Sequence, residues 1–366
     1  MLRRRWLKIL ACSFAIVVRS VPALAQSSYV YVPNEGSDSI SGFSVDAETG
    51  MLVPLPGSPY AAGSHPTGIA VPPSGRFLYV SNYGGFGDCG SSAPGSISGF
   101  NIDPTTGALT PMSGSPFPTG LAPYWLALAP SGRFVYTANY CNNNVSAFAV
   151  DPSSGVLTEV QGSPFAAGSA VDGVTVDQSG RFAYVSNAND GNISVYRVDA
   201  NSGQLTAIAG SPFSSQGSYP IQLTFGNSGR YAYVANSSGS VAQLKVDPKT
   251  GSLSPVATVS SGFGGGAFAV TPSGKFGYAA ACGANSVVAF RITPSSGSLA
   301  PLSGSPFASG SCPFTSVADS DFVFVPNYYD GTLSVFRIDH ATGELTPVPG
   351  SPFTTGSFPA NVALVR

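Results

Sequence analysis

Two side chains that could carry acid–base chemistry, His65 and Asp172, stand immediately before apolar segments. An imidazole titrates near neutral pH, so His65 is a candidate general base. Asp172 ends an Ala-Val-Asp segment at 170–172, where the comparable segments 64–66 and 218–220 end in proline. A carboxylate at that place is a candidate acid, base or ligand. The competing interpretation of His65 is a variable position before proline, because other copies of the segment carry unrelated residues there.

A second group of side chains is suited to binding. Tyrosine and asparagine residues cluster in short loops that follow aromatic runs, and their rings and amides can stack on a ligand and hydrogen-bond to it. The candidates for this role are Tyr83, Asn139, Tyr140, Tyr328 and Tyr329.

Loop carboxylates form a third group. Glu35, Asp38, Asp190 and Asp330 lie in equivalent loops, and with nearby asparagines they offer oxygen ligands of the kind that a hard divalent cation prefers. No loop carries a dense ligand motif. We therefore interpret these side chains as solvated loop residues and expect neither a metal nor a cofactor.

Composition limits the elements that can position these residues. Only 9% of the 366 residues are charged, against about 25% in an average globular protein. The 44 glycines and 31 prolines accompany 43% hydrophobic residues, which is enough for a core. This composition predicts many short strands joined by turns. The net charge of −2, with no Lys/Arg cluster after residue 8, excludes a basic nucleic-acid-binding protein.

The N-terminus has the organisation of a secretory signal peptide. Arg3, Arg4, Arg5 and Lys8 precede an apolar run at 9–18, and Ala-Leu-Ala at 23–25 is a cleavage signal. The run is too short for a membrane anchor, and it continues past Cys12, which argues against a lipoprotein. We expect residues 1–25 to be removed and a mature chain, 26–366, to be exported to the periplasm or the cell exterior. Its net charge would be about −7.

The mature chain consists of one repeated unit. An aromatic-x-x-Asn segment begins at Tyr31 and recurs after steps of 48, 57, 48, 49, 45 and 46 residues, with an insertion at 84–95 in the long step and Ala281 replacing the asparagine once. An Asp-x-x-x-Gly turn and a Gly-Ser-Pro-aromatic ending recur at fixed offsets. Charged residues that recur at these turns are interpreted as structural.

Each unit contains four short strand-like runs, and four-stranded units of 40–50 residues build β-propellers. Seven units predict an all-β, seven-bladed propeller with four antiparallel strands per blade, in a single domain that we expect to be a monomer. The mature chain starts at a second strand and ends on a first-strand pattern at 358–365. The terminal blade is therefore predicted to be closed by both ends of the chain.

Four cysteines remain after cleavage, and an even number in an exported protein favours disulfides. Cys89 and Cys141 lie in equivalent loops of neighbouring units, whereas Cys282 begins such a loop and Cys312 opens the next unit on the same face. The repeat predicts Cys89–Cys141 and Cys282–Cys312. The spacings do not suit zinc.

The strand segments at 79–82, 136–139 and 184–187 each follow a Ser-Gly-Arg-Phe turn and precede Asp-x-x-[Ser/Thr]-Gly-x-Leu. These motifs resemble the bacterial seven-bladed lactonase family, also called 6-phosphogluconolactonase-like or muconate-cycloisomerase-like. The resemblance covers the mature chain. It implies hydrolysis or formation of a lactone ring at the mouth of the central channel, with His, Arg and Glu on the innermost strands and the loops that lead into them.

The chain departs from that family pattern. Across the seven corresponding segments there is one His and one Asp, and neither Arg nor Glu. Two hypotheses follow: a lactonase for an uncharged or cationic small-molecule lactone, assisted by His65 or Asp172, or a non-catalytic propeller that binds a glycan, peptide or cell-surface partner. No basic cluster is present to hold a phosphorylated sugar lactone.

Overall fold

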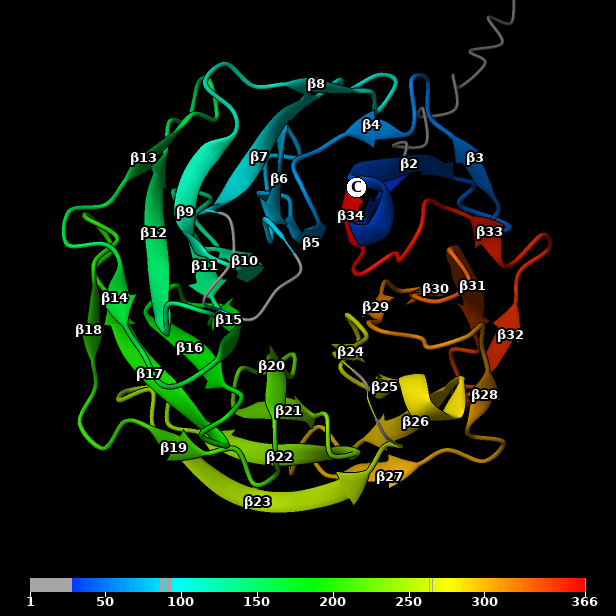
Figure 1. Ribbon diagram of the computed structural model, residues 1–366. Helices are drawn as coiled ribbons and strands as arrows, with labels where there is room; N and C mark the ends of the chain where they lie inside the picture. Colours follow the sequence, from blue (N-terminus) through cyan, green and yellow to red (C-terminus); the bar gives the residue numbers. More distant parts are fainter. Residues whose placement is uncertain (1–27, 86–88, 90–93, 263, 265, 366) are drawn as a thin grey trace, which may run out of the picture.

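Seven antiparallel sheets form a closed ring, with the innermost strand of each sheet facing the centre (Figure 1). The computed structural model describes residues 28–85, 89, 94–262, 264 and 266–365. The predicted signal peptide, residues 1–25, lies outside the described residues. The predicted seven-bladed propeller is confirmed.

The strands occupy the same positions in every blade. From the blade that contains both chain ends, the innermost strands are β34 (Ala363–Val365), β5 (Pro66–Ala70), β10 (Pro123–Leu128), β15 (Val171–Val176), β20 (Pro220–Phe225), β24 (Phe268–Val270) and β29 (Val317–Ala318). The second strands are β1 (Ser28–Asn34), β6 (Phe77–Asn82), β11 (Phe134–Asn139), β16 (Phe182–Asn187), β21 (Tyr231–Asn236), β25 (Phe276–Ala281) and β30 (Phe322–Asn327). The third strands are β2 (Ser39–Val45), β7 (Pro94–Ile102), β12 (Asn144–Val150), β17 (Asn192–Val198), β22 (Ser240–Val246), β26 (Ser286–Ile292) and β31 (Thr332–Ile338).

The outer edge of six blades contains two short strands, where the sequence predicted one. The fourth strands are β3 (Leu52–Pro54), β8 (Leu109–Pro111), β13 (Leu157–Glu159), β18 (Leu205–Ala207), β23 (Leu253–Ser260), β27 (Leu299–Pro301) and β32 (Leu345–Pro347). In six blades a short fifth strand follows the Gly-Ser-Pro motif and also pairs with the third strand: β4 (Tyr60–Ala61), β9 (Phe117–Leu121), β14 (Phe165–Ala166), β19 (Phe213–Ser214), β28 (Phe307–Ala308) and β33 (Phe353–Thr354). The blade of β20–β23 lacks the motif, and its long β23 covers the whole edge. Two short 3₁₀ helices, η1 (Glu35–Ser37) and η2 (Cys282–Ala284), follow β1 and β25.

The repeated tyrosine joins each blade to the next one. The hydroxyl of Tyr79 in β6 donates to the carbonyl of Gly155 (2.6 Å), which closes the Asp-x-x-x-Gly turn of the following blade. Tyr136 makes the same bond to Gly203 (3.0 Å). Because both partners are buried, these bonds satisfy carbonyl groups that water cannot reach. The motif that revealed the repeat is therefore an inter-blade contact.

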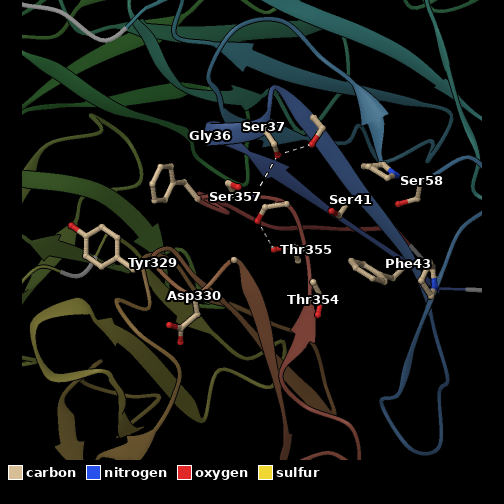
Figure 2. A pocket seen from close by; sticks show the side chains of 16 residues that line it. Gly36, Ser37, Ser41, Phe43, Ser58, Tyr329, Asp330, Thr354, Thr355 and Ser357 are labelled. Carbon is tan, nitrogen blue, oxygen red and sulfur yellow. Dashed lines mark hydrogen bonds between the residues drawn. The ribbon is translucent and has the colours of Figure 1, made fainter.

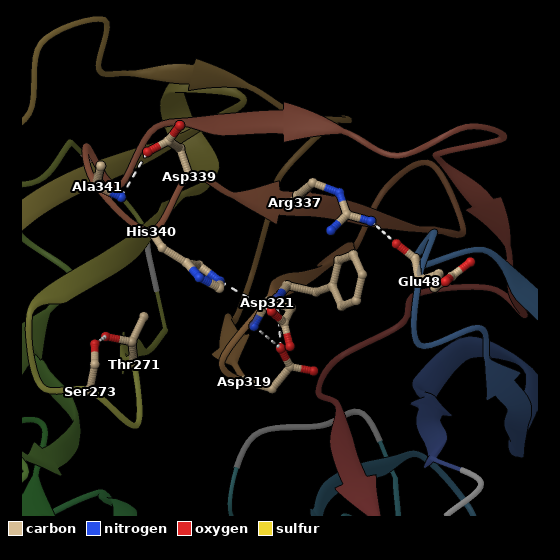
Figure 3. Close-up of polar contacts among 10 residues, drawn as sticks. Glu48, Thr271, Ser273, Asp319, Asp321, Arg337, Asp339, His340 and Ala341 are labelled. Carbon is tan, nitrogen blue, oxygen red and sulfur yellow. Dashed lines mark hydrogen bonds and ion pairs between the residues drawn. The ribbon is translucent and has the colours of Figure 1, made fainter. Parts of the chain in front are cut away.

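The repeated charges hold turns at the outer end of the blades. Asp339 accepts hydrogen bonds from the backbone N–H groups of Ala341 and Thr342 (both 2.8 Å), as Asp residues do in Asx turns. Arg337 donates to the backbone carbonyl of Glu48 in the neighbouring blade (Figure 3). The second histidine, His340, contacts exposed Asp321 (3.1 Å) at this end. The recurring turn base Arg76 likewise donates to the backbone carbonyls of Pro152 and Ser153 in the next blade, so the repeated turn charges have structural partners, as their recurrence predicted.

Both predicted disulfides, Cys89–Cys141 and Cys282–Cys312, are present. Each links neighbouring blades, as the repeat frame required. In the part of the chain that the structure describes, no helix has the length and apolarity needed to cross a membrane.

Candidate functional site

One end of the ring is built from three repeated positions. The residue after the second-strand asparagine donates its backbone N–H to the carbonyl of the residue before the innermost strand, as Tyr83 does to His65 and Tyr140 does to Ala122 (both 2.9 Å). The acceptor residue has a left-handed backbone, with φ of 53° at His65 and 54° at Ala122. The third position is in the innermost strand, directly after the position that proline occupies in other copies. In several blades, side chains at these positions line a common cavity, although those of His65 and Ala122 do not.

The three positions meet in a cavity of about 470 Å³, which we call the central pocket. All seven blades contribute to it. Its lining consists of Glu35, Tyr83, Tyr124, Tyr140, Asp172, Tyr219, Ile221, Ser237, Cys282, Cys312, Phe314, Tyr328 and Tyr329. A cavity of this size, mostly aromatic with a few polar groups, has the properties of a small-molecule site.

Asp172 lies in the wall of the central pocket, and only 5% of it is exposed. The structure corrects its repeat position. Val171, and not Asp172, pairs with Asn187 as Pro66 pairs with Asn82. Asp172 therefore occupies the position after the proline, which Tyr124 and Ile221 fill in the two adjacent blades.

The surroundings of Asp172 favour its protonated form. Burial raises the pKa of the Asp172 carboxyl well above its usual range, and the nearby Trp125 indole opposes this shift in part. The two groups do not reach hydrogen-bond geometry: Trp125 Nε1 and Asp172 Oδ1 are both buried without a hydrogen-bond partner among the described residues. Burying a carboxyl without a full set of hydrogen-bond partners lowers the stability of the fold, and such a group is typical of a functional position.

A second carboxyl in the central pocket, Glu35, was interpreted from the sequence as a solvated loop residue. In the structure it is 5% exposed and accepts a hydrogen bond from the Tyr328 hydroxyl (2.8 Å). Burial raises the pKa of Glu35, and the Tyr328 bond opposes the increase. The sequence signal for Glu35 as a pocket residue is its position directly after Asn34. At the equivalent position, other blades carry Tyr83 and Tyr140.

Tyrosine side chains connect the two carboxyls. Burial raises the pKa of the Tyr124 phenol, and the charges of Asp172 and Glu35 raise it further. The same two carboxyls act on the pKa of Tyr83, whose ring packs edge-on against Tyr124 at 5.9 Å. Across the pocket the Tyr140 and Tyr219 hydroxyls are 3.5 Å apart. The raised pKa values of Tyr83 and Tyr124 favour their protonated form, in which they are hydrogen-bond donors beside the carboxyls.

The remaining predicted site residues have varied positions. Tyr83, Tyr140, Tyr328 and Tyr329 line the central pocket. Asn139 does not: it is fully buried inside its blade, where its amide donates to Asn144 (2.7 Å) and Ser146 (2.8 Å). His65 is not part of the pocket lining. Its ring Nδ1 is 3.0 Å from Ser64 Oγ, and its backbone N–H donates to Asp38 (2.8 Å).

Three of the loop carboxylates bind segments that lead into innermost strands. Asp190 accepts from the backbone N–H of Ser169 (2.7 Å) and Asp330 from that of Ser311 (2.5 Å), each at the entry to its own blade, whereas Asp38 accepts from His65 at the entry to the next blade. Within the described ranges, no group of three or more His, Cys, Asp and Glu side chains could hold a metal ion. Of the four carboxylates considered as cation ligands, Asp38, Asp190 and Asp330 thus have backbone donors as partners, and Glu35 has the Tyr328 hydroxyl.

Comparison with known proteins identifies the family. The profile described as "Lactonase, 7-bladed beta-propeller" matches residues 25–172, 163–262 and 256–357. The chain belongs to this seven-bladed lactonase family. No curated protein sequence matches it significantly.

Solved structures share the propeller of this lactonase-family chain. A periplasmic gluconolactonase from Pseudomonas aeruginosa has a TM-score of 0.78 and 24% identity, covering 93% of this chain and 99% of that one. A provisionally assigned 6-phosphogluconolactonase from Bacteroides uniformis has a TM-score of 0.81 and 21% identity, covering 93% and 100%. At these identities the similarity establishes the fold.

The electrostatic character of this lactonase-family pocket is acidic. Among the described residues, its lining contains the carboxyls of Asp172 and Glu35 and no Arg, Lys or His. Tyrosine hydroxyls supply the hydrogen-bond donors. The site can therefore accept a proton and donate hydrogen bonds, but its lining offers no fixed positive charge.

Proposed function

We propose that the chain hydrolyses the ring ester of an uncharged or cationic lactone in the central pocket, at the mouth of the propeller channel. The observation that supports this most directly is the convergence of two buried carboxyls and several phenols in one small-molecule-sized cavity. Membership of the lactonase family supports the reaction class.

In this mechanism the Asp172 carboxylate removes a proton from a water molecule while the oxygen of that water attacks the lactone carbonyl carbon. Phenol O–H groups donate to the developing oxyanion, and Tyr83 and Tyr124 are the candidates because both carboxyls act on their pKa values. When the tetrahedral intermediate collapses, the ring C–O bond breaks and the alkoxide takes the proton from Asp172. The product is the open-chain hydroxy acid, and the carboxylate is regenerated.

The charge of the pocket defines the preferred substrate. A phosphate group near Glu35 and Asp172 would meet like charges and no Arg or Lys of the lining. We expect kcat/KM for glucono-1,5-lactone to exceed that for its 6-phosphate by at least about tenfold. Pure enzyme, assayed against both lactones and corrected for spontaneous hydrolysis, measures this ratio.

Each outcome of this assay has a definite meaning. Preference for the phosphorylated lactone would contradict the proposed substrate class. Failure to hydrolyse any lactone in a panel of neutral, cationic and phosphorylated rings, combined with binding of a glycan or peptide, would replace the proposal with the non-catalytic alternative.

We also propose that the protein acts after export. The two disulfides support an oxidising compartment. We expect the mature chain to begin at Gln26 and to contain no free thiol.

The Cys89–Cys141 bond closes a loop with a sequence separation of 52, so the double variant Cys89→Ser/Cys141→Ser should lose about 2–4 kcal/mol of unfolding free energy. Intact-mass analysis, peptide mapping without reductant and denaturant titration test these points; a retained N-terminus or free thiols would contradict export.

A further inference from the structure

A second cavity, which we call the lateral groove, adjoins the central pocket on the boundary between the last blade and the first (Figure 2). Its volume is about 830 Å³, which is large enough for a ligand of drug size or above. One wall comes from β2 and the other from β33 and the loop between β30 and β31. We propose that this groove binds the sugar chain of an oligosaccharide lactone whose lactone ring occupies the central pocket.

The two cavities share one lining residue, Tyr329. The Tyr329 side chain is 65% exposed, although it is large and aromatic. Phe358, which lines the groove and is 38% exposed, stacks on Tyr328 of the central pocket with ring centroids 5.0 Å apart. Tyr328, Tyr329 and Phe358 thus form an aromatic surface from one cavity to the other, on which the apolar faces of sugar rings can pack.

The groove walls offer hydroxyl groups with an unused donor. Ser41 is 5% exposed; its Oγ accepts a hydrogen bond from the Asn34 amide (3.0 Å), and the O–H has no acceptor among the described residues. Ser58 Oγ likewise accepts from the backbone N–H of Gly42 (2.9 Å). A hydroxyl that already accepts inside the protein retains one hydrogen to donate to a ligand oxygen. Thr354 contributes a further hydroxyl on the opposite wall.

The charges of the groove favour a neutral ligand with many hydroxyls. Asp330 is the one ionisable group of the lining besides the Tyr329 phenol; its Oδ2 accepts from Ser311, and its other oxygen can accept from a ligand O–H. The described part of the chain places neither Lys nor Arg in the groove lining to hold an anion. Carboxylate and hydroxyl groups beside exposed aromatic rings match the alternating polar edges and apolar faces of a saccharide.

The test uses a substitution that fills the lateral groove and leaves the lining of the central pocket unchanged. Thr354 pairs with Thr332 in the last blade as Ala308 pairs with Ser286 in the preceding one, so Ala308→Trp is a matched control for Thr354→Trp. Ala308 lines neither the groove nor the central pocket. The probes are glucono-1,5-lactone and the 1,5-lactones of cellotetraonic and maltotetraonic acid.

We expect kcat/KM for at least one tetrasaccharide lactone to exceed that for gluconolactone by about tenfold, because contacts in the groove add transition-state binding. Thr354→Trp should abolish this advantage and leave gluconolactone hydrolysis unchanged, whereas Ala308→Trp should change neither. An advantage that survives Thr354→Trp, or no advantage in the wild type, would overturn the proposal.

The inference rests on the proposed function, and calorimetry separates the two. If no lactone is hydrolysed, the proposed function fails, and binding of reduced cellotetraose or maltotetraose still tests the groove. Binding that is lost in Thr354→Trp and retained in Ala308→Trp supports the groove as a saccharide site. Absence of binding to both sugars refutes it.

Discussion

Asp172→Asn is expected to lower kcat/KM for lactone hydrolysis by about 10²- to 10⁴-fold, the usual contribution of a positioned general base. The amide keeps the size of the carboxyl but cannot take a proton from water. Steady-state assays with glucono-1,5-lactone measure the loss. Asp190→Asn is the matched control, because Asp190 lies in the same blade and its carboxylate accepts from the Ser169 backbone outside the central pocket. Activity of Asp172→Asn within tenfold of wild type would remove Asp172 from the mechanism.

The pH dependence of hydrolysis is a second, independent test of Asp172 as the general base. The proposed base works only when ionised, and burial raises the pKa of Asp172 well above its usual range. Wild-type kcat/KM should therefore fall as the pH decreases through that raised pKa, at a pH where an ordinary aspartate is still ionised. The residual activity of Asp172→Asn should lack this acidic limb.

Stability should change in the opposite direction from activity. The folded Asp172 carboxyl binds its proton more tightly than the unfolded one, so between the two pKa values the folded state holds a proton that unfolding releases. The unfolding free energy of the wild type should decrease as the pH rises across that window, and Asp172→Asn should remove the decrease. Thermal unfolding at neutral pH should show a higher Tm for the variant. A lower Tm would indicate that the activity loss reflects damage to the fold.

Much of the fold is predictable from the sequence because the repeat is under physical constraint. Tyr79 and its equivalents recur because their hydroxyls bond to the Gly155 turn of the next blade, and Asn187 recurs because its amide binds inside the blade. Such contacts need the same residue at the same spacing each time. The disulfide between Cys282 and Cys312 follows from the same frame.

The candidate site was less predictable because it depends on departures from the repeat. Val171 stands where the adjacent blades carry proline, and without that marker the sequence alignment places Asp172 at the proline position, one residue early. An error of one residue exchanges the two faces of a strand. Glu35 was overlooked because a loop glutamate is usually solvated, although its slot holds pocket-lining tyrosines elsewhere. Asn139 was misleading because a repeated amide inside a blade looks like a surface amide in sequence.

Ending the chain after Ser357 is expected to abolish stable folding, although the deleted segment is short. β34 pairs with β1 through Ala363, Leu364 and Val365, and Val362 and Val365 are buried in the first blade. Burial of each such side chain contributes about 1.5–3 kcal/mol, so the two valines together contribute about 3–6 kcal/mol, which is comparable with the lower end of a typical total stability of about 5–15 kcal/mol. The truncation also exposes the inner edge of β1, which invites pairing between molecules. Calorimetry and size-exclusion chromatography should show lost cooperativity and aggregation.

A circular permutant distinguishes loss of the strand from loss of the chain end. Because Tyr29 pairs directly with Val365, a short linker can join the C-terminal strand to β1. New ends can be opened at the exposed turn between Ser131 and Gly132, which leaves every inner strand in its blade. This permutant should unfold within a few degrees of the wild type, since all seven sheets keep their strands. If the truncated chain folded as stably as the permutant, the closure of the ring by β34 would not be the source of its stability, and the remaining strands of the first blade would have to hold the propeller together alone.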